Sequence, residues 1–159
     1  MEQLKAKILT MEDLAKRVAF WRMLGDKIVF TNGCFDILHP GHVHLLSASK
    51  QEGDRLIVGL NADVSVKRLK GETRPINNEQ SRAIVLSALG DVDAVILFEE
   101  DTPLHLITAL QPDVLIKGGD WEVSTIVGAD VVRANGGLVK TIPYLKGHST
   151  TAIIEKSNY

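Results

Sequence analysis

Apolar residues along this chain fall into short, nearly continuous runs that are separated by stretches with helical spacing. The runs are rich in β-branched residues and occupy residues 27–31, 55–60, 94–98, 114–117 and 138–142. Strands that are covered on both faces have this pattern, because neither face meets water. Helical spacing is found at residues 40–53, 78–89, from 102 onward, 124–135 and 149–156. The alternation predicts βαβ units and therefore an α/β fold, a Rossmann-like, doubly wound, five-stranded parallel sheet with helices on both faces.

A further helix is predicted over residues 10–25, ahead of the first strand. Thr10 can cap this helix with Asp13 as the partner of a short capping box, and Gly25 is placed to end it. We therefore treat residues 1–26 as an N-terminal helical extension and residues 27–159 as the remainder of what is a single domain overall. The one long irregular stretch is residues 67–78, and loops of this length are often functional.

Composition and charge exclude several classes of protein. The 159 residues include 18 basic and 20 acidic side chains, and a net charge of −2 argues against a protein that binds nucleic acid by neutralising phosphates. No charge-free apolar run reaches about 18 residues, so we expect no membrane insertion. The first residues lack the apolar core of a signal peptide. The single cysteine, Cys34, cannot form an intramolecular disulfide, which fits a cytoplasmic protein.

The most informative segment follows the first predicted strand, at the end of the sheet where doubly wound proteins bind ligands. Asn32 and Gly33 give a tight turn close to the strand tip. His39 and His42 stand three positions apart across the start of a helix that Pro40 opens, so both rings can project from one face. The N-terminus of a helix attracts anions. Two imidazoles beside it suit a phosphate whose charge grows during a reaction.

Two other interpretations of these histidines stay open at this point. The rings can simply cap the helix, or they can form a zinc site together with His44. Zinc is disfavoured because His44 lies roughly 160° away from His42 around a helix. In addition, no cysteine or carboxylate completes the ligand set at the usual spacing. For Cys34, a small buried filler is favoured over a reactive thiol.

Residues 31–36 (TNGCFD), followed by residues 39–42 (HPGH), resemble the signature of the cytidylyltransferase-like nucleotidyltransferases, whose hallmark is His-x-Gly-His. Further segments match this superfamily in the same order, at residues 61–63, 67–75, 117–121 and 147–151. The resemblance covers residues 27–156. It implies that residues 27–159 form a nucleotidyltransferase domain.

Within the superfamily, the segments FTNGCFDILHPGHV, RLKGETRPI, FEEDTP and KGGDW most resemble the adenylyltransferase domain of bacterial ADP-heptose synthases. The resemblance implies that AMP is transferred from ATP to D-glycero-β-D-manno-heptose 1-phosphate, giving ADP-heptose and pyrophosphate for the lipopolysaccharide core. In many bacteria this domain is fused behind a sugar kinase. With only 26 residues ahead of the first strand, we expect the stand-alone form. The alternatives are a CTP-dependent enzyme for glycerol 3-phosphate or a similar polyol phosphate, and a non-catalytic, nucleotide-binding regulatory module.

The resemblance also implies roles for single residues. The catalytic residues are His39, His42 and Lys70. The nucleotide-binding residues are Thr31, Asn32, Gly33, Cys34, Phe35, Lys117, Gly118, Gly119, Asp120, Ser149, Thr150 and Thr151. The residues for the substrate phosphate are Lys67, Arg74 and Arg82, cations that compensate the charge of leaving pyrophosphate, with Arg68 as a solvated neighbour.

Magnesium is implied together with ATP, but the sequence identifies no metal ligand, and Asp36 and Asp63 are candidates for an outer shell. Relatives carry an arginine near the position of Tyr144, and Lys146 is the candidate replacement for its charge. Trp121 is either a nucleotide contact or an aromatic residue of the core or rim. We also expect a homo-oligomer.

Overall fold

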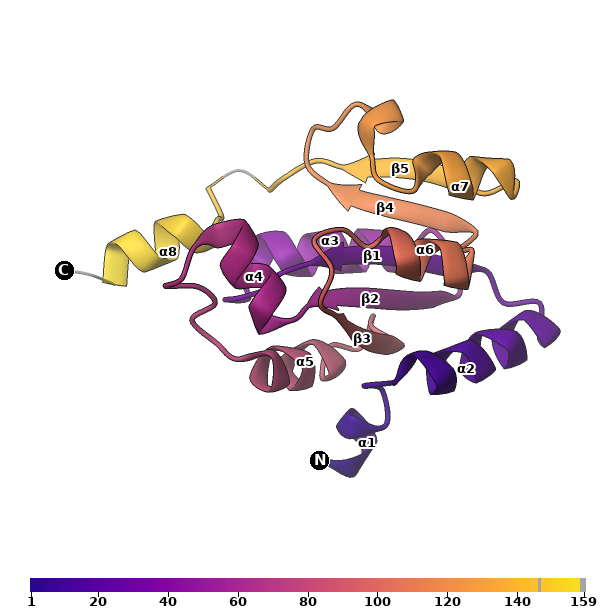
Figure 1. The fold of residues 1–159 in the computed structure, drawn as a ribbon, viewed down its shortest axis with the longest axis horizontal. Helices are drawn as coiled ribbons and strands as arrows, with labels where there is room; N and C mark the ends of the chain where they lie inside the picture. Colours follow the sequence, from indigo (N-terminus) through magenta and orange to yellow (C-terminus); the bar gives the residue numbers. More distant parts are fainter. Residues whose placement is uncertain (146, 158–159) are drawn as a thin grey trace.

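The computed structural model describes residues 1–145 and 147–157, and it confirms the predicted fold class (Figure 1). Five parallel strands form one sheet in the order β3-β2-β1-β4-β5. The strands are β1 (Ile28–Gly33), β2 (Arg55–Asn61), β3 (Ala94–Phe98), β4 (Val114–Gly118) and β5 (Leu138–Ile142). All five lie where the apolar runs predict them.

The strand order reverses between β1 and β4. β1 pairs with β2 on one side and with β4 on the other, so that Phe30 lies opposite both Ile57 and Leu115. The chain runs from β1 through β2 to β3, and only then crosses to the other side of β1 to form β4 and β5. The segments that leave β1 and β4 therefore diverge at the carboxyl ends of these strands and leave room for a ligand between them.

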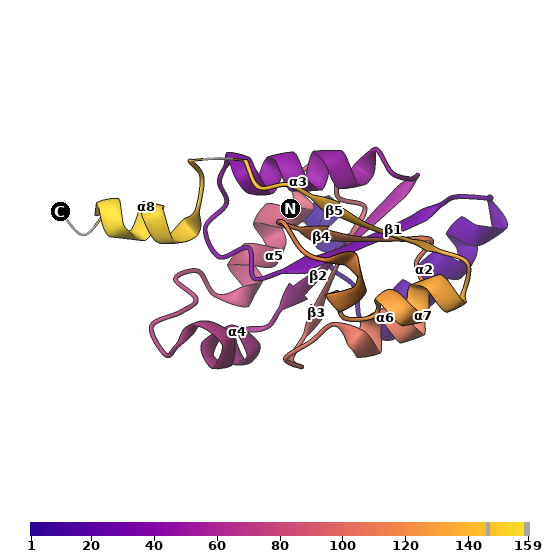
Figure 2. The same ribbon diagram turned by 90° about the horizontal axis from the view of Figure 1, so that it is seen from above.

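Helices cover both faces of the sheet (Figure 2). One face packs against α3 (Pro40–Lys50) and α5 (Glu79–Ser87), and the other against α2 (Met11–Met23), α6 (Leu104–Leu110) and α7 (Ala129–Ala134). Successive strand residues point to opposite faces and both sets are buried. The apolar runs are therefore continuous rather than alternating.

The helix predicted at residues 10–25 is α2, and it packs on the sheet of its own chain. Thr10 Oγ1 accepts a hydrogen bond from the backbone N–H of Asp13 at 3.2 Å, and Gly25 follows the helix at φ +82°. Its apolar stripe joins the core of the sheet. A short helix ahead of it, α1 (Glu2–Lys5), was not predicted, because four residues are too few to show a periodicity.

The prediction of an irregular stretch at residues 67–78 is wrong for residues 67–70, which are helical. Helix α4 (Asp63–Lys70) continues through residues 67–70, and the loop starts only at Gly71, which has φ +97°. The last turn of α4 carries three of the basic side chains. Their backbone is therefore fixed by helical hydrogen bonds, and the freedom that a loop would have given them is absent.

Two other helix predictions need correction. The helix expected at residues 124–135 is divided into a 3₁₀ turn, Val123–Thr125, and α7, with Gly128 between them at φ +84°. A side chain at Gly128 would meet the Ile107 side chain at 2.8 Å, so the chain turns there without one. Pro103 is the N-cap of α6 rather than its first helical residue.

The last helix, α8 (Thr150–Ser157), extends beyond the end of the sheet (Figure 1). It begins where the sequence predicts. No helix in the described part of the chain has the length and apolar character to span a membrane.

Candidate active site

The turn after β1 places an aromatic ring beneath the paired histidines. Phe35 takes the left-handed conformation, with φ +44°, and its ring is buried. A Cβ at Gly33 would lie 3.0 Å from this ring, so the glycine makes the space that the ring occupies. The ring centroid of Phe35 lies 5.1 Å from that of His42. The turn thus packs the Phe35 ring against His42.

The two histidines stack on each other at the start of α3. Their ring centroids are 3.8 Å apart and the planes are inclined by 23°. A Cβ at Gly41 would lie 3.0 Å from the His39 ring, so the glycine between them permits the stack. His39 occupies the N-cap position, but its side chain makes no capping hydrogen bond. The structure therefore brings both rings to one face, as predicted, and contradicts the capping interpretation.

Both imidazoles are held in the neutral form at pH 7. Burial lowers the pKa of His42 to about 4, with a further lowering by His39, while a hydrogen bond with the backbone of Ile37 opposes it. Burial, followed by His148, also lowers the pKa of His39. The Nδ1 atoms of His39 and His42 are buried and have no hydrogen-bond partner among the described residues. Buried polar atoms of this kind are rare, and a bound ligand would satisfy them.

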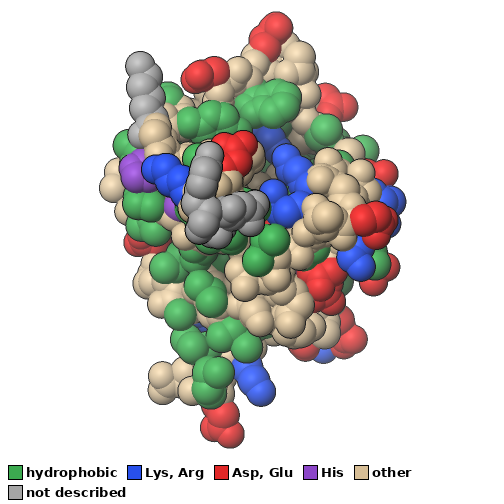
Figure 3. Space-filling model, turned by 90° about the vertical axis from the view of Figure 1, so that its left-hand side faces the viewer, with side chains coloured by type: hydrophobic (Ala, Val, Ile, Leu, Met, Phe, Trp, Pro, Cys, Tyr) green, Lys and Arg blue, Asp and Glu red, His purple; other side chains and the backbone are tan. Residues whose placement is uncertain are grey.

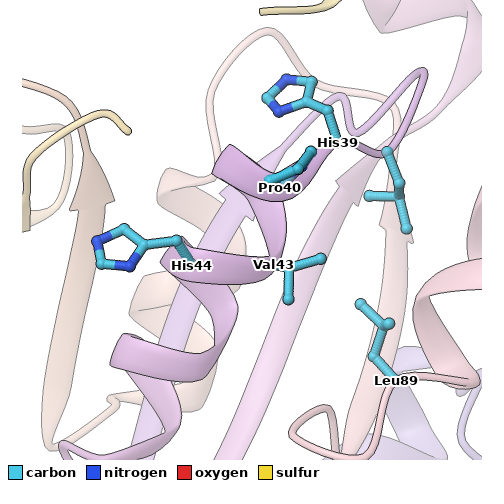
Figure 4. Close-up of a pocket in the computed structure, with 6 residues that line it drawn as sticks. His39, Pro40, Val43, His44 and Leu89 are labelled. Carbon is cyan, nitrogen blue, oxygen red and sulfur yellow. The ribbon is translucent and has the colours of Figure 1, made fainter. Parts of the chain in front are cut away.

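A zinc site receives no support from this geometry. His44 is exposed and lies apart from His39 along α3 (Figure 4). No group of three histidine, cysteine, aspartate or glutamate side chains in the described chain could hold a metal ion.

An apolar pocket of about 670 Å³ lies beside the histidine pair (Figure 4). The residues that line it are Leu38, His39, Pro40, Val43, His44 and Leu89. A sugar needs partners for its hydroxyl groups, and this lining offers few of them. The pocket therefore adjoins the candidate site without forming its sugar-binding part.

Cations gather at the carboxyl ends of the strands, where Figure 3 shows lysine and arginine side chains in a recess. Burial lowers the pKa of Lys117, and Lys70 lowers it further, whereas Cys34 opposes this effect. Burial raises the pKa of Cys34, although Lys70 acts in the other direction. The tip of β4, the end of α4 and the turn after β1 therefore face one another. A neutral thiol there fits the favoured interpretation of Cys34 as a filler.

Arg74 fixes the loop after α4 to the turn after β1. Its Nε donates to the Asp36 carboxylate at 2.6 Å, and the backbone N–H groups of Ile76 and Asn77 donate to the same carboxylate at 2.8 and 3.0 Å. Burial raises the pKa of Asp36, but these hydrogen bonds outweigh it and lower the pKa overall. Nothing in the sequence indicated these backbone contacts, because any residue except proline could have supplied them.

Arg82 is fully buried, and its nitrogen atoms are committed to hydrogen bonds within the chain. The acceptors are the backbone oxygens of Asn77, Cys34 and Asn61 and the carboxylate of Asp63, at 2.6–3.0 Å. A phosphate could reach this guanidinium only if these bonds were broken. The structure therefore does not support the predicted contact of Arg82 with a phosphate. Arg82 instead connects four segments of the site through its hydrogen bonds.

The other cations of α4 point in different directions. Arg68 donates to Asp101 at 2.7 Å and to the backbone oxygen of Glu99, away from the histidines, which fits the solvated neighbour that we expected. Lys67 and Lys70 are exposed. Of these residues, Lys70 is the one that lies close enough to influence Cys34 and Lys117.

The described carboxylates near the site do not fit a magnesium ion. Asp36 is saturated by Arg74 and two backbone N–H groups, and Asp63 pairs with Arg82 at 2.7 Å. Asp36 is therefore a structural anion and not the outer-shell acid that we expected. Asp63 is paired through Oδ1 only and its side chain is 29% exposed, so its role as an outer-shell acid stays a prediction.

The remaining predicted residues surround the same end of the sheet. Thr31 is buried with an unpartnered Oγ1, and Asn32 and Gly118 are partly exposed at strand tips. Trp121 is half exposed, its Nε1 donates to the Gly118 oxygen at 3.0 Å, and Lys117 Nζ lies 5.7 Å from its ring centroid. Trp121 is thus a rim residue, and Asp120 before it is exposed.

The N-terminus of α8 meets the turn after β1. Ser149 Oγ accepts from the Ala152 N–H at 3.1 Å, and Thr150 Oγ1 donates to the Ile37 oxygen at 3.5 Å. Thr151 is exposed. Lys146, the candidate replacement for an arginine, lies outside the described residues.

The parallel sheet defines a Rossmann-like fold, and the histidine pair and the cations at its switch point are a candidate site for an anion. The family model described as cytidylyltransferase-like matches residues 30–156, and the chain belongs to this family. The resemblance found in the sequence is thereby confirmed.

Individual relatives share most of this chain. The bifunctional protein HldE of Hyphomonas neptunium is 59% identical over 153 residues, which are 96% of this chain and 32% of the relative. The HldE of Koribacter versatilis is 53% identical over 97% of this chain and 32% of its own length. The chain thus spans about a third of these curated relatives. A solved lipopolysaccharide core biosynthesis protein from Thermoplasma volcanium superposes with a TM-score of 0.61 at 34% identity, over 78% of this chain and all of that one.

Proposed function

We propose that this chain transfers AMP from ATP to a sugar 1-phosphate, D-glycero-β-D-manno-heptose 1-phosphate, giving ADP-heptose and pyrophosphate for the lipopolysaccharide core. The observation that carries the proposal is the stacked pair of His39 and His42, whose buried Nδ1 atoms lack partners at a helix N-terminus beside the switch point. The choice of sugar is supported by the similarity to a protein of lipopolysaccharide core biosynthesis.

The proposed reaction is a direct in-line displacement. A phosphate oxygen of the sugar 1-phosphate attacks the α-phosphorus of ATP, the bond from this phosphorus to the bridging oxygen breaks, and pyrophosphate leaves with the electron pair. An anion against His39 and His42 favours their protonated forms and raises their low pKa values, so that the rings stabilise the charge that develops. Lys70 compensates the charge of pyrophosphate.

Magnesium enters this proposal only as a counter-ion carried by the phosphates of ATP, and no residue is assigned to it. We further propose that the protein is cytoplasmic, because its single cysteine, Cys34, cannot form an intramolecular disulfide. We also propose that it forms a homo-oligomer.

The test is pyrophosphate release by the purified chain, with ATP or CTP against a panel of sugar and polyol phosphates. We expect turnover with ATP and the heptose 1-phosphate, and far less with CTP. Comparable turnover with CTP and glycerol 3-phosphate would replace the proposal with the cytidylyltransferase alternative. Nucleotide binding without turnover of any pair would indicate the regulatory module.

A further inference from the structure

The segment after β5 brings an aromatic side chain onto the turn after β4. The backbone N–H of Gly119 donates to the Ile142 oxygen at 2.8 Å, so the two segments start side by side. Two residues beyond Ile142, the ring of Tyr144 reaches across to the glycine. A Cβ at Gly119 would lie 2.7 Å from Cε2, 2.8 Å from Cζ and 2.9 Å from Oη of Tyr144. The outer end of the Tyr144 ring therefore lies against the Gly119 backbone.

Core packing does not explain the position of Tyr144. The residue is 68% exposed, although the outer end of its ring lies against Gly119. Its hydroxyl has no hydrogen-bond partner within the part of the chain that the structure describes. A large ring held at an open site, over a backbone without side chains, offers a flat surface to a ligand.

The surroundings indicate what kind of ligand fits this surface. Gly119 follows β4 directly, and Lys117 at the tip of β4 is electrostatically coupled to Cys34 in the turn after β1. The Tyr144 ring thus lies on the β4–β5 side of the switch point, and the histidine pair on the β1 side. A nucleotide whose phosphates contact the histidines and which spans the switch point would place its base on the β4–β5 side.

Trp121, the other aromatic residue of this rim, is already engaged. Its indole N–H donates to the Gly118 oxygen, and its ring faces Lys117. Tyr144 has no comparable engagement, and its exposed face is larger. Of the two rings, Tyr144 is the one that is free to stack.

We propose that Tyr144 stacks on the nucleotide base and is a determinant of the preference for a purine. The inference rests on the proposed function, because it requires a nucleotide in the site. Stacking on an aromatic side chain needs only the π-face of the base, and the two-ring purine covers more of the tyrosine than a pyrimidine does. The Gly119 backbone packs against the outer end of the tyrosine ring, and the base stacks on the face of the ring that is open to solvent.

The test is calorimetric binding of ATP, CTP and tripolyphosphate to the full chain. For Tyr144→Ala we expect ATP to bind about 5- to 100-fold more weakly, as is typical for the loss of one stacking ring. The loss for CTP is expected to be smaller, and tripolyphosphate, which has no base, is expected to bind as it does to the wild type. Tyr144→Phe keeps the ring and is expected to bind ATP normally. Phe20→Ala, at an exposed aromatic residue of α2, is the matched control.

The outcomes separate the stacking role from the proposed function. If the wild type binds ATP and Tyr144→Ala binds it equally well, the stacking role is overturned while the proposed function stands. An equal loss for ATP and tripolyphosphate would assign Tyr144 to the phosphates and would also overturn the stacking role. A wild type that binds neither ATP nor CTP would remove the proposed function itself. The melting temperature of each variant verifies that it is folded.

Discussion

Around the turn between β1 and α3, the ion pairs of the candidate site are buried and hydrogen-bonded, whereas the site is exposed along α4 and in the segment after β5. On the β1 side, Asp36 accepts three hydrogen bonds and the Arg82 side chain has no exposed surface. On the open side, Lys70 is exposed, and Tyr144 is 68% exposed with the outer end of its ring against Gly119. On the β1 side, the hydrogen bonds of Asp36 and Arg82 fix the backbone around the histidine pair, whereas the open side keeps charges and an aromatic ring available for a ligand.

The largest effect is expected when the β1 side loses an anchor. Asp36→Ala leaves the Arg74 guanidinium and two backbone N–H groups without their acceptor in a buried place. Removal of one partner of a buried ion pair costs about 3–5 kcal/mol of stability. Urea denaturation of the variant and the wild type measures this difference.

An exposed ion pair supplies the control for this prediction. Asp101 and Arg68 are 2.7 Å apart, close to the 2.6 Å between Asp36 and Arg74, but their side chains are 63% and 50% exposed. Asp101→Ala is therefore expected to change the free energy of unfolding by no more than about 1 kcal/mol. Equal losses for Asp36→Ala and Asp101→Ala would contradict the distinction between the two sides.

The next effect concerns catalysis on the β1 side. His42→Ala is expected to lower kcat by about 10²–10³ with little change in melting temperature, because the ring acts on the transition state and caps nothing. His44→Ala, two residues further along α3 and exposed, is expected to keep full activity. An unchanged kcat in a folded His42→Ala protein would rule out the mechanism proposed for the pair.

On the open side, Lys70→Ala is expected to weaken transition-state stabilisation by about 2–4 kcal/mol, because negative charge accumulates on leaving pyrophosphate. The variant is expected to have a lower kcat and a nearly unchanged KM, and steady-state kinetics measures both. Arg68→Ala is the matched control, because this neighbouring cation is directed at Asp101. If both variants lose the same activity, the effect reflects the overall charge of α4 and not a contact of Lys70.

The smallest expected effect is a difference in pH dependence between two groups of the β1 side. The pKa of His42 is about 4 in the folded chain against an ordinary value of 6.5, so between these values the unfolded chain binds more protons. The free energy of unfolding therefore falls as the pH drops from 6.5 toward 4, and His39 adds to the fall in the same direction. His42→Ala is expected to flatten this slope in denaturation curves measured between pH 4 and 7.

The pKa of Asp36 is shifted in the same direction, but the shift acts in a separate and more acidic window. Its pKa lies below the ordinary value of 3.8, so its stabilisation is present above that pH and is lost as the pH falls below it. His42→Ala is thus expected to leave the loss below pH 3.8 unchanged. A variant that retained the full slope above pH 4 would show that the histidine pair does not titrate in this way.

The sheet and the histidine pair could be predicted from the sequence alone, because both depend on local spacing. Continuous apolar runs identify strands buried on both faces wherever they pair. The start of α3 brings His39 and His42 to one face through helical geometry, with Gly41 as the space between the rings. These features need no information about distant parts of the chain.

In contrast, which cations and which aromatic ring are available to a ligand depends on contacts between distant parts of the folded chain. Lys70, Arg74 and Arg82 are equally basic in the sequence, but Arg74 binds Asp36 and Arg82 binds Asp63 across gaps of 38 and 19 residues, whereas Lys70 stays exposed. Tyr144 meets Gly119 only because β4 and β5 pair side by side. Whether a charge or a ring serves the fold or a ligand depends on the partners that folding brings to it, and sequence spacing does not contain those partners.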